Sequence, residues 1–163
     1  MPNIPAQQSS NMQDYLEAII VLRGESEAVK VTQISKALGV RNSSVTAAMA
    51  KLSRAGLVEH KRYGHVELTA EGEEIARDVY QRHKTLRHFL TRILDVEPQV
   101  ADGDACRMEH VLSESTMERL EKFLEFVLNC PRGEPEWLNG FNYYLEHGER
   151  DQESLARCQR EAS

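Results

Sequence analysis

Residues 31 to 68 read VTQISKALGVRNSSVTAAMAKLSRAGLVEHKRYGHVEL, and this stretch decides the fold of the N-terminal part of the chain. A short helical pattern ends at Gly39, because glycine readily takes the left-handed conformation found at helix C-termini. A second helical pattern follows to about residue 55. Its inward-facing positions, spaced i, i+4 and i+7, are Val45, Met49 and Leu52. Two short alternating segments around Tyr63-Gly64 then predict a β-hairpin. Helix, tight turn, helix and hairpin in this order predict a winged helix-turn-helix.

Positive charge is concentrated on the same stretch. The whole chain has 20 basic and 26 acidic residues and a formal net charge of −6, whereas residues 31–66 contain six basic residues and a single acid, Glu59. A phosphate-binding surface needs local positive charge, not a basic average. Short polar side chains at the start of the second helix let its backbone approach base edges, and the hairpin tip can lie along the DNA backbone or in the minor groove. The predicted DNA contacts are Thr32, Gln33, Arg41, Asn42, Ser43, Ser44, Thr46, Lys51, Lys61, Arg62 and Tyr63. A winged helix used for protein contacts remains the alternative.

The rest of the chain has a helical apolar rhythm. A first helix is predicted over residues 13–23, and a long helix capped by Thr69 over residues 70–94. Shorter helices are predicted over residues 100–112, 116–128 and 136–147. The predicted fold class is therefore mainly α, with a winged helix-turn-helix in residues 1–69. An all-helical domain follows in residues 70–150, and a polar tail in residues 151–163.

Side chains that bind metals recur at helical spacing. Asp14 and Glu17 are spaced i, i+3, so both carboxylates project from one helix face. Cys106, Glu109 and His110 are spaced i, i+3, i+4 and also share a face. A thiolate, a carboxylate and an imidazole together suit a transition metal and not Ca²⁺ or Mg²⁺. Spacing alone leaves open that these residues are a solvated pair and a buried, inert cysteine. Further candidate ligands are His83 and Asp102.

With these motifs in place, the chain resembles the diphtheria toxin repressor family of iron- and manganese-dependent regulators, over about residues 12–128. The resemblance rests on the segments 14–17 (DYLE), 43–46 (SSVT), 68–69 (LT), 71–72 (EG), 82–83 (RH) and, above all, 105–113 (ACRMEHVLS). It implies metal ligands at Asp14, Glu17, His83, Cys106, Glu109 and His110. Asp102 and Arg87 fall where iron-type members have a histidine and a glutamate of a second site. The sequence departs from the family pattern there, which puts the ligands of a second site in doubt.

The resemblance also implies a function. A homodimer, formed by residues 70–128, would bind a palindromic DNA operator and repress metal-homeostasis genes when Fe²⁺ or Mn²⁺ is bound. Oxygen ligands at Asp14 and Glu17 favour Mn²⁺, while the Cys106 thiolate favours Fe²⁺ and later metals, and we expect Fe²⁺. Iron-type relatives often carry a third, SH3-like domain. Only about 35 residues follow Leu128, so we expect a short form without it.

The remaining sequence features limit the classes of function that the chain can have. The sequence predicts no membrane span and no signal peptide, hence a cytoplasmic protein. Three widely spaced cysteines, Cys106, Cys130 and Cys158, do not form a disulfide framework. No nucleophile is paired with a base, so we expect no enzyme and no small organic substrate. Two alternatives remain: a winged-helix regulator that responds to a small molecule or partner, and a metalloenzyme with an open coordination position.

Overall fold

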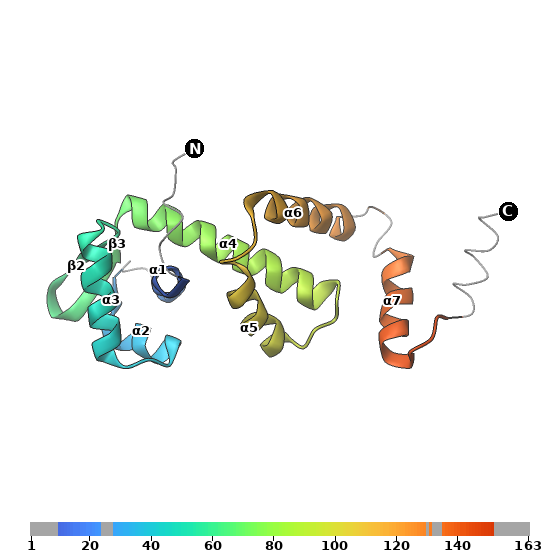
Figure 1. The fold of residues 1–163 in the computed structure, drawn as a ribbon, viewed down its shortest axis with the longest axis horizontal. Coiled ribbons are helices and arrows are strands. Elements are labelled where there is room, and N and C mark those ends of the chain that lie inside the picture. Colours follow the sequence, from blue (N-terminus) through green and yellow to red (C-terminus); the bar gives the residue numbers. More distant parts are fainter. Residues whose placement is uncertain (1–9, 24–27, 130, 132–134, 152–163) are drawn as a thin grey trace. The chain divides into compact units, whose positions relative to one another are not determined.

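The computed structural model describes residues 10–23, 28–129, 131 and 135–151. The chain forms two compact units, an N-terminal unit (Met1–Arg82) and a C-terminal unit (His83–Ser163). Helices dominate both, and the described residues contain one three-stranded sheet, in the N-terminal unit (Figure 1). The predicted fold class, a mainly α chain that begins with a winged helix-turn-helix, is confirmed.

The N-terminal unit follows the predicted order of elements and adds one strand. Its elements are α1 (Ser10–Leu22), β1 (Val29–Lys30), α2 (Val31–Leu38), α3 (Asn42–Arg54), β2 (Val58–His60), a 3-10 turn (Arg62–Gly64), β3 (His65–Leu68) and the first part of α4 (Ala70–Arg92). The sheet is antiparallel with the order β1-β3-β2, and β2 pairs with β3 in the register Val58↔Leu68 and His60↔Val66. Strand β1 was not predicted, because two residues are too short to show an alternating pattern.

A shared apolar core joins the helix-turn-helix to α1. Val45, Met49 and Leu52 are fully buried, so the predicted inward stripe of α3 is confirmed. They belong to the same cluster as Leu16 and Ile19 of α1. The position of α1 is therefore coupled to the position of α3 by direct packing.

The start of α4 is fixed against Gly56 and Leu57, the two residues before β2; the hairpin of β2 and β3 (residues 58–68) is the wing. Thr69 Oγ1 accepts a hydrogen bond from the Gly72 N–H at 3.1 Å, which confirms Thr69 as the cap. The same hydroxyl donates to the carbonyl oxygen of Gly56 at 2.7 Å, and the Thr69 N–H donates to the carbonyl oxygen of Leu57 at 3.0 Å. Gly72 itself lies directly against the Leu57 backbone, where a Cβ atom would be 1.9 Å from the Leu57 oxygen.

Helices are the only regular secondary structure among the described residues of the C-terminal unit. It contains the last part of α4, α5 (Pro98–Met108), α6 (Glu114–Leu128) and α7 (Glu136–His147). Helix α5 ends four residues before the predicted end, but Glu109 keeps helical angles (φ −57°, ψ −29°) and its N–H donates to the Ala105 oxygen at 3.0 Å. Two small clusters form the core: Leu86, Leu90, Ala101, Ala105 and Met117, and Ile93, Leu124, Val127 and Leu138.

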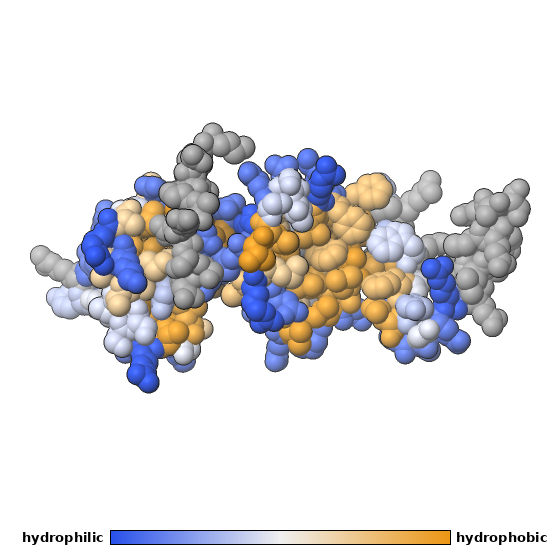
Figure 2. Space-filling view, in the orientation of Figure 1, coloured by the Kyte–Doolittle hydropathy of each residue, from blue (hydrophilic) through white to orange (hydrophobic). Residues whose placement is uncertain are grey.

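Apolar side chains also reach the surface of the C-terminal unit (Figure 2). They include Val111, Phe126 and Trp137, which are 78%, 80% and 51% exposed. Beyond Leu128 the described residues contain α7 and no strand. None of the described helices is both long and apolar enough to span a bilayer.

Candidate metal centre

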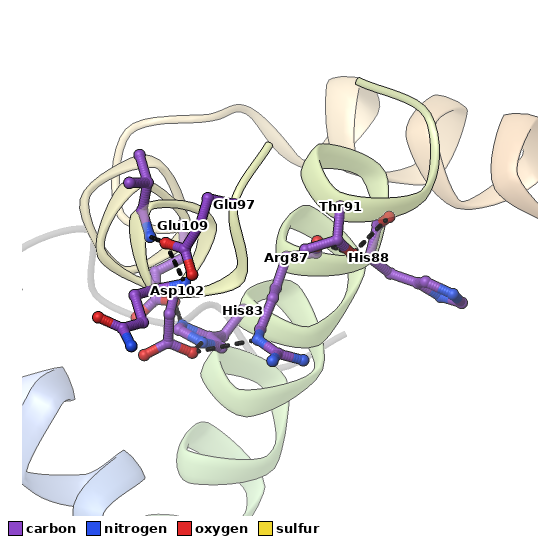
Figure 3. A network of polar contacts seen from close by, with 9 residues as sticks. His83, Arg87, His88, Thr91, Glu97, Asp102 and Glu109 are labelled. Atoms are coloured by element: carbon purple, nitrogen blue, oxygen red, sulfur yellow. Dashed lines mark hydrogen bonds and ion pairs between the residues drawn. The ribbon is translucent and has the colours of Figure 1, made fainter. Parts of the chain in front are cut away.

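His83 of α4 lies between two carboxyl groups of the α5 segment. Its Nδ1 atom is 2.9 Å from Glu109 Oε2, and its Nε2 atom is 3.2 Å from Asp102 Oδ1 (Figure 3). The imidazole side chain is only 13% exposed. Both ring nitrogens therefore face an oxygen, and the orientation of the ring is fixed by contacts on two sides.

Glu109 is the buried centre of the site. The residue is 2% exposed, and its Oε1 atom lies 3.3 Å from His110 Nε2. A carboxyl group taken this far out of water needs polar or cationic partners, because burial without them costs several kcal/mol. His83 and His110 contact it from two sides.

A thiol completes this part of the site. Cys106 is half-buried and lies one helical turn before Glu109. Donor atoms of Cys106, Glu109 and His110 lie within 4.8 Å of one another. The end of α5 thus brings sulfur, oxygen and nitrogen donors to one point, although His110 is in the turn after the helix and not on it. This mixture of donors fits a divalent transition metal and does not fit the oxygen-only preference of Ca²⁺ or Mg²⁺.

Asp102 faces two different partners. Its Oδ1 atom lies 3.2 Å from His83 Nε2 and 3.3 Å from Arg87 Nε. In Figure 3 a dashed line joins the Asp102 carboxylate to the guanidinium of Arg87. Asp102 is therefore already paired with a permanent cation.

The other two candidate ligands belong to the N-terminal unit. Asp14 and Glu17 are half-buried residues of α1, one turn apart. Their spacing places both carboxyl groups on the same side of that helix.

The predicted DNA-contacting residues lie on the helix-turn-helix and on the hairpin of β2 and β3. Those that the structure describes in full are all exposed: Thr32, Gln33, Arg41, Asn42, Ser43, Ser44, Thr46, Lys51, Lys61 and Tyr63. The side chain of Arg62 lies outside the described part of the chain. Two of the polar side chains have local backbone partners: Gln33 Oε1 accepts from the Lys30 N–H at 2.9 Å, and Thr46 Oγ1 donates to the Asn42 oxygen at 2.9 Å.

The wing differs from a simple basic loop. Lys61 Nζ lies 3.0 Å from Glu59 Oε2 and 3.1 Å from Glu67 Oε2. Hydrogen bonds to Glu59 and then Glu67 raise the pKa of Lys61 above its usual value. Its charge is therefore partly offset within the wing, and a DNA phosphate has to compete with two carboxylates for it. At the tip, Tyr63 is 91% exposed and has a positive φ of 61°.

Comparisons with known proteins identify the family of the chain. Residues 7–66 match the iron dependent repressor, N-terminal DNA binding domain, and residues 69–138 match the iron dependent repressor, metal binding and dimerisation domain. The chain belongs to the iron-dependent repressor family. An uncharacterised HTH-type transcriptional regulator of Methanocaldococcus jannaschii is 36% identical over 118 residues, which cover 72% of this chain and 94% of the relative. The regulator MntR of Bacillus subtilis is 32% identical over 116 residues, which cover 71% of this chain and 81% of the relative.

Solved structures of the family show the same fold. A manganese-dependent transcriptional repressor in complex with manganese superposes with a TM-score of 0.64 at 30% identity, covering 71% of this chain and 53% of that chain. IdeR of T. acidophilum superposes with a TM-score of 0.61 at 26% identity, and the match covers 76% of this chain and 57% of that chain. The present chain thus spans about half the length of these solved regulators.

The resemblance placed Asp102 and Arg87 at two positions of one second site, but the sequence did not predict that they pair with each other. Arg87 lies four residues after His83, so the two side chains emerge from neighbouring turns of α4. That spacing is visible in the sequence. The approach of α5, which brings Asp102 to both side chains, is not.

Proposed function

We propose that this chain is a homodimeric DNA-binding repressor whose affinity for its operator is switched by Fe²⁺ or Mn²⁺. The observation that carries the proposal is the buried Glu109, contacted by His83 and His110, with the Cys106 thiol one turn away. These residues lie in the segment that matches the metal-binding and dimerisation domain of the family. We propose that the DNA-binding domain ends at residue 69 and the metal-binding domain begins at residue 70. The family models, which cover residues 7–66 and 69–138, support this boundary.

The proposed ligands come from two parts of the chain. His83, Cys106, Glu109 and His110 would bind the ion from the C-terminal unit, and Asp14 and Glu17 from α1. The donor chemistry supports the whole set, since carboxylates, imidazoles and a thiolate all bind divalent iron and manganese. When bound, the ion supplies positive charge that offsets the negative charge of the carboxylates and thiolate.

The proposed switch follows from the core of the N-terminal unit. Leu16 and Ile19 of α1 share one apolar cluster with Val45 and Met49 of α3. Ligands on α1 would therefore transmit the state of the metal site to the recognition helix through packed side chains. A protein with two such arrangements shifts towards the one that binds metal better, and the affinities for metal and DNA are then coupled in both directions.

A dimer would present two α3 helices to successive major grooves, about 34 Å apart, which explains the expectation of a palindromic operator. Exposed apolar side chains such as Phe126 and Trp137 give the C-terminal unit surface suited to subunit contact. The relatives act as transcriptional regulators by name, and the proposed role is regulatory and not enzymatic.

For the metal itself, we favour Fe²⁺. Several solved structures are named as manganese regulators, and this chain has a thiol at Cys106. A soft thiolate favours Fe²⁺ over Mn²⁺, and the oxygens of Asp14 and Glu17 act in the opposite direction. Anaerobic titration of chelator-treated protein with each ion, followed by fluorescence anisotropy of a labelled operator at fixed salt, decides the preference. Tighter switching by Mn²⁺ would contradict the iron assignment and leave the metal switch intact.

The assignment of the site is tested by the double substitution Glu109→Ala and His110→Ala. The variant should fold, since both residues are at the end of α5, and should lose the response of operator binding to metal. Asp104→Ala is the control, because Asp104 pairs with Arg107 on the same helix. Metal-dependent operator binding by the double variant would disprove the site. Operator binding by the wild type that is unaffected by a chelator would instead favour a regulator that senses a small molecule or partner.

A further inference from the structure

On the side away from Glu109, the ring of His83 contacts the carboxylate of Asp102. Nδ1 faces Glu109, so this nitrogen points towards the proposed metal donors, and Nε2 faces Asp102. A histidine that binds a metal through one nitrogen usually donates its other N–H to a carboxylate or carbonyl, which fixes the tautomer and the ring orientation. Asp102 occupies that outer position.

Arg87 fixes Asp102 in turn. Its Nε atom lies 3.3 Å from Oδ1 of Asp102, the same oxygen that faces His83. A guanidinium is charged at every relevant pH and has no acceptor, so it can only donate to the carboxylate. A second divalent ion bound by Asp102 would lie next to this permanent positive charge and would be repelled by it.

We propose that Asp102 and Arg87 do not bind metal but form a positioning pair that holds His83 with Nε2–H directed at Asp102 and Nδ1 directed at the proposed metal donors. This inference rests on the proposed function, because it assigns a supporting role within the same site. It replaces the expectation from sequence that Asp102 is itself a ligand. It also predicts that the chain lacks a separate metal site at Asp102.

The exposure of Asp102 and Arg87 distinguishes a role in positioning His83 from a role in folding stability. The side chains of Asp102 and Arg87 are 61% and 48% exposed, whereas that of His83 is 13% exposed. Ion pairs this exposed contribute little to folding stability. Loss of Asp102 should therefore change metal affinity much more than the stability of the metal-free protein.

Asp104 provides a matched control. It lies two residues from Asp102, and therefore on a different face of α5, and forms an ion pair with Arg107. Asp102→Ala and Asp104→Ala therefore remove the same group from the same helix. Only the first removes the contact to His83.

The experiment measures Mn²⁺ affinity and stoichiometry of the full-length, chelator-treated protein by the EPR signal of free Mn²⁺. Asp102→Ala should weaken binding by about 10- to 100-fold, the usual range for loss of an outer-sphere partner. Asp104→Ala should stay within about fivefold of wild type. Asp102→Asn should recover part of the loss, because its amide oxygen still accepts from Nε2–H. Arg87→Ala should weaken binding in the wild type and have little further effect in Asp102→Ala, because Arg87 acts through Asp102.

A second readout follows the imidazole directly. In ¹⁵N NMR spectra of the Zn²⁺-loaded protein, wild type and Asp104→Ala should show the His83 proton on Nε2, protected from exchange, and Asp102→Ala should lose this protection. Equal Mn²⁺ affinity of Asp102→Ala and Asp104→Ala would overturn the inference. Tighter Mn²⁺ binding by Arg87→Ala, or an additional Mn²⁺ ion bound by it, would also overturn the inference. Either result would show that Asp102 binds metal once Arg87 is removed. If the wild type binds no Mn²⁺, or Glu109→Ala with His110→Ala binds it unchanged, the proposed site itself fails.

Discussion

Replacing Gly72 with alanine should destabilise the protein, although alanine is the better helix former. Gly72 is buried in the first turn of α4. An added Cβ would be 1.9 Å from the Leu57 carbonyl oxygen, 2.8 Å from its carbonyl carbon and 3.2 Å from its Cα. All three atoms belong to the backbone, so no side chain can rotate away to relieve the clash.

The magnitude follows from opposing effects. Helix propensity favours alanine over glycine by about 1 kcal/mol. Against this, α4 and the Leu57 segment must separate by about 1 Å, and such overpacking costs about 1–3 kcal/mol. The separation also weakens the hydrogen bond from the Thr69 N–H to the Leu57 oxygen, which contributes about 0.5–1.5 kcal/mol. The net loss is about 0.5–3.5 kcal/mol, or a decrease in Tm of about 1–14 °C for a chain of this size.

Thermal unfolding measured by circular dichroism tests this prediction. Wild type and variant are compared without metal and at one protein concentration, since ligands and dimerisation both change the apparent Tm. Gly103→Ala is the control, because Gly103 is inside α5 and the nearest atom to an added Cβ is Arg107 Nη1 at 3.7 Å. That substitution should stabilise the protein by about 0.5–1 kcal/mol. A Gly72→Ala protein that unfolds at or above the wild-type Tm would refute the steric argument.

Three further predictions concern pH, salt and metal. The pairing of Glu73 with Arg23 and Arg77 lowers the pKa of Glu73 to about 2 from an ordinary value of 4.5, so its contribution to folding stability is present above about pH 4.5 and is lost as the pH falls towards 2. Glu73→Gln should therefore lower the Tm at pH 7 and reduce the decrease in Tm between pH 4.5 and 2; parallel curves for the two proteins would contradict this. Lys51→Ala should weaken operator binding and reduce its salt dependence by up to about one counterion, whereas Lys61→Ala should do so less, because Lys61 is already paired with two carboxylates; equal salt slopes in fluorescence anisotropy would show that the wing carboxylates do not matter. Removal of metal with a chelator should weaken operator binding by about 1–3 kcal/mol, measured at constant ionic strength, and unchanged binding would exclude a metal switch.

Local patterns explain what could be predicted from the sequence. The apolar stripe of α3, the hairpin turn near Tyr63 and the cap at Thr69 each depend on residues close together in the chain, and the structure has all three. The convergence of Cys106, Glu109 and His110 also follows from helical spacing, even though α5 ends at Met108. Exposure of the polar start of α3 was equally predictable, because its inward positions are apolar.

Contacts between segments distant in the chain were decided only by the tertiary structure. His83 meets Glu109 and Asp102 across 26 and 19 residues, and Gly72 meets Leu57 across the wing. Periodicity assigns a residue to a face of its own helix but does not say which residue of another helix lies opposite. The sequence by itself therefore determined the helices, the β2–β3 hairpin and the candidate metal donors. The packing of α5 on α4 decided that Asp102 faces both His83 and Arg87, because two helices can pack in many registers and only the full set of core contacts selects one.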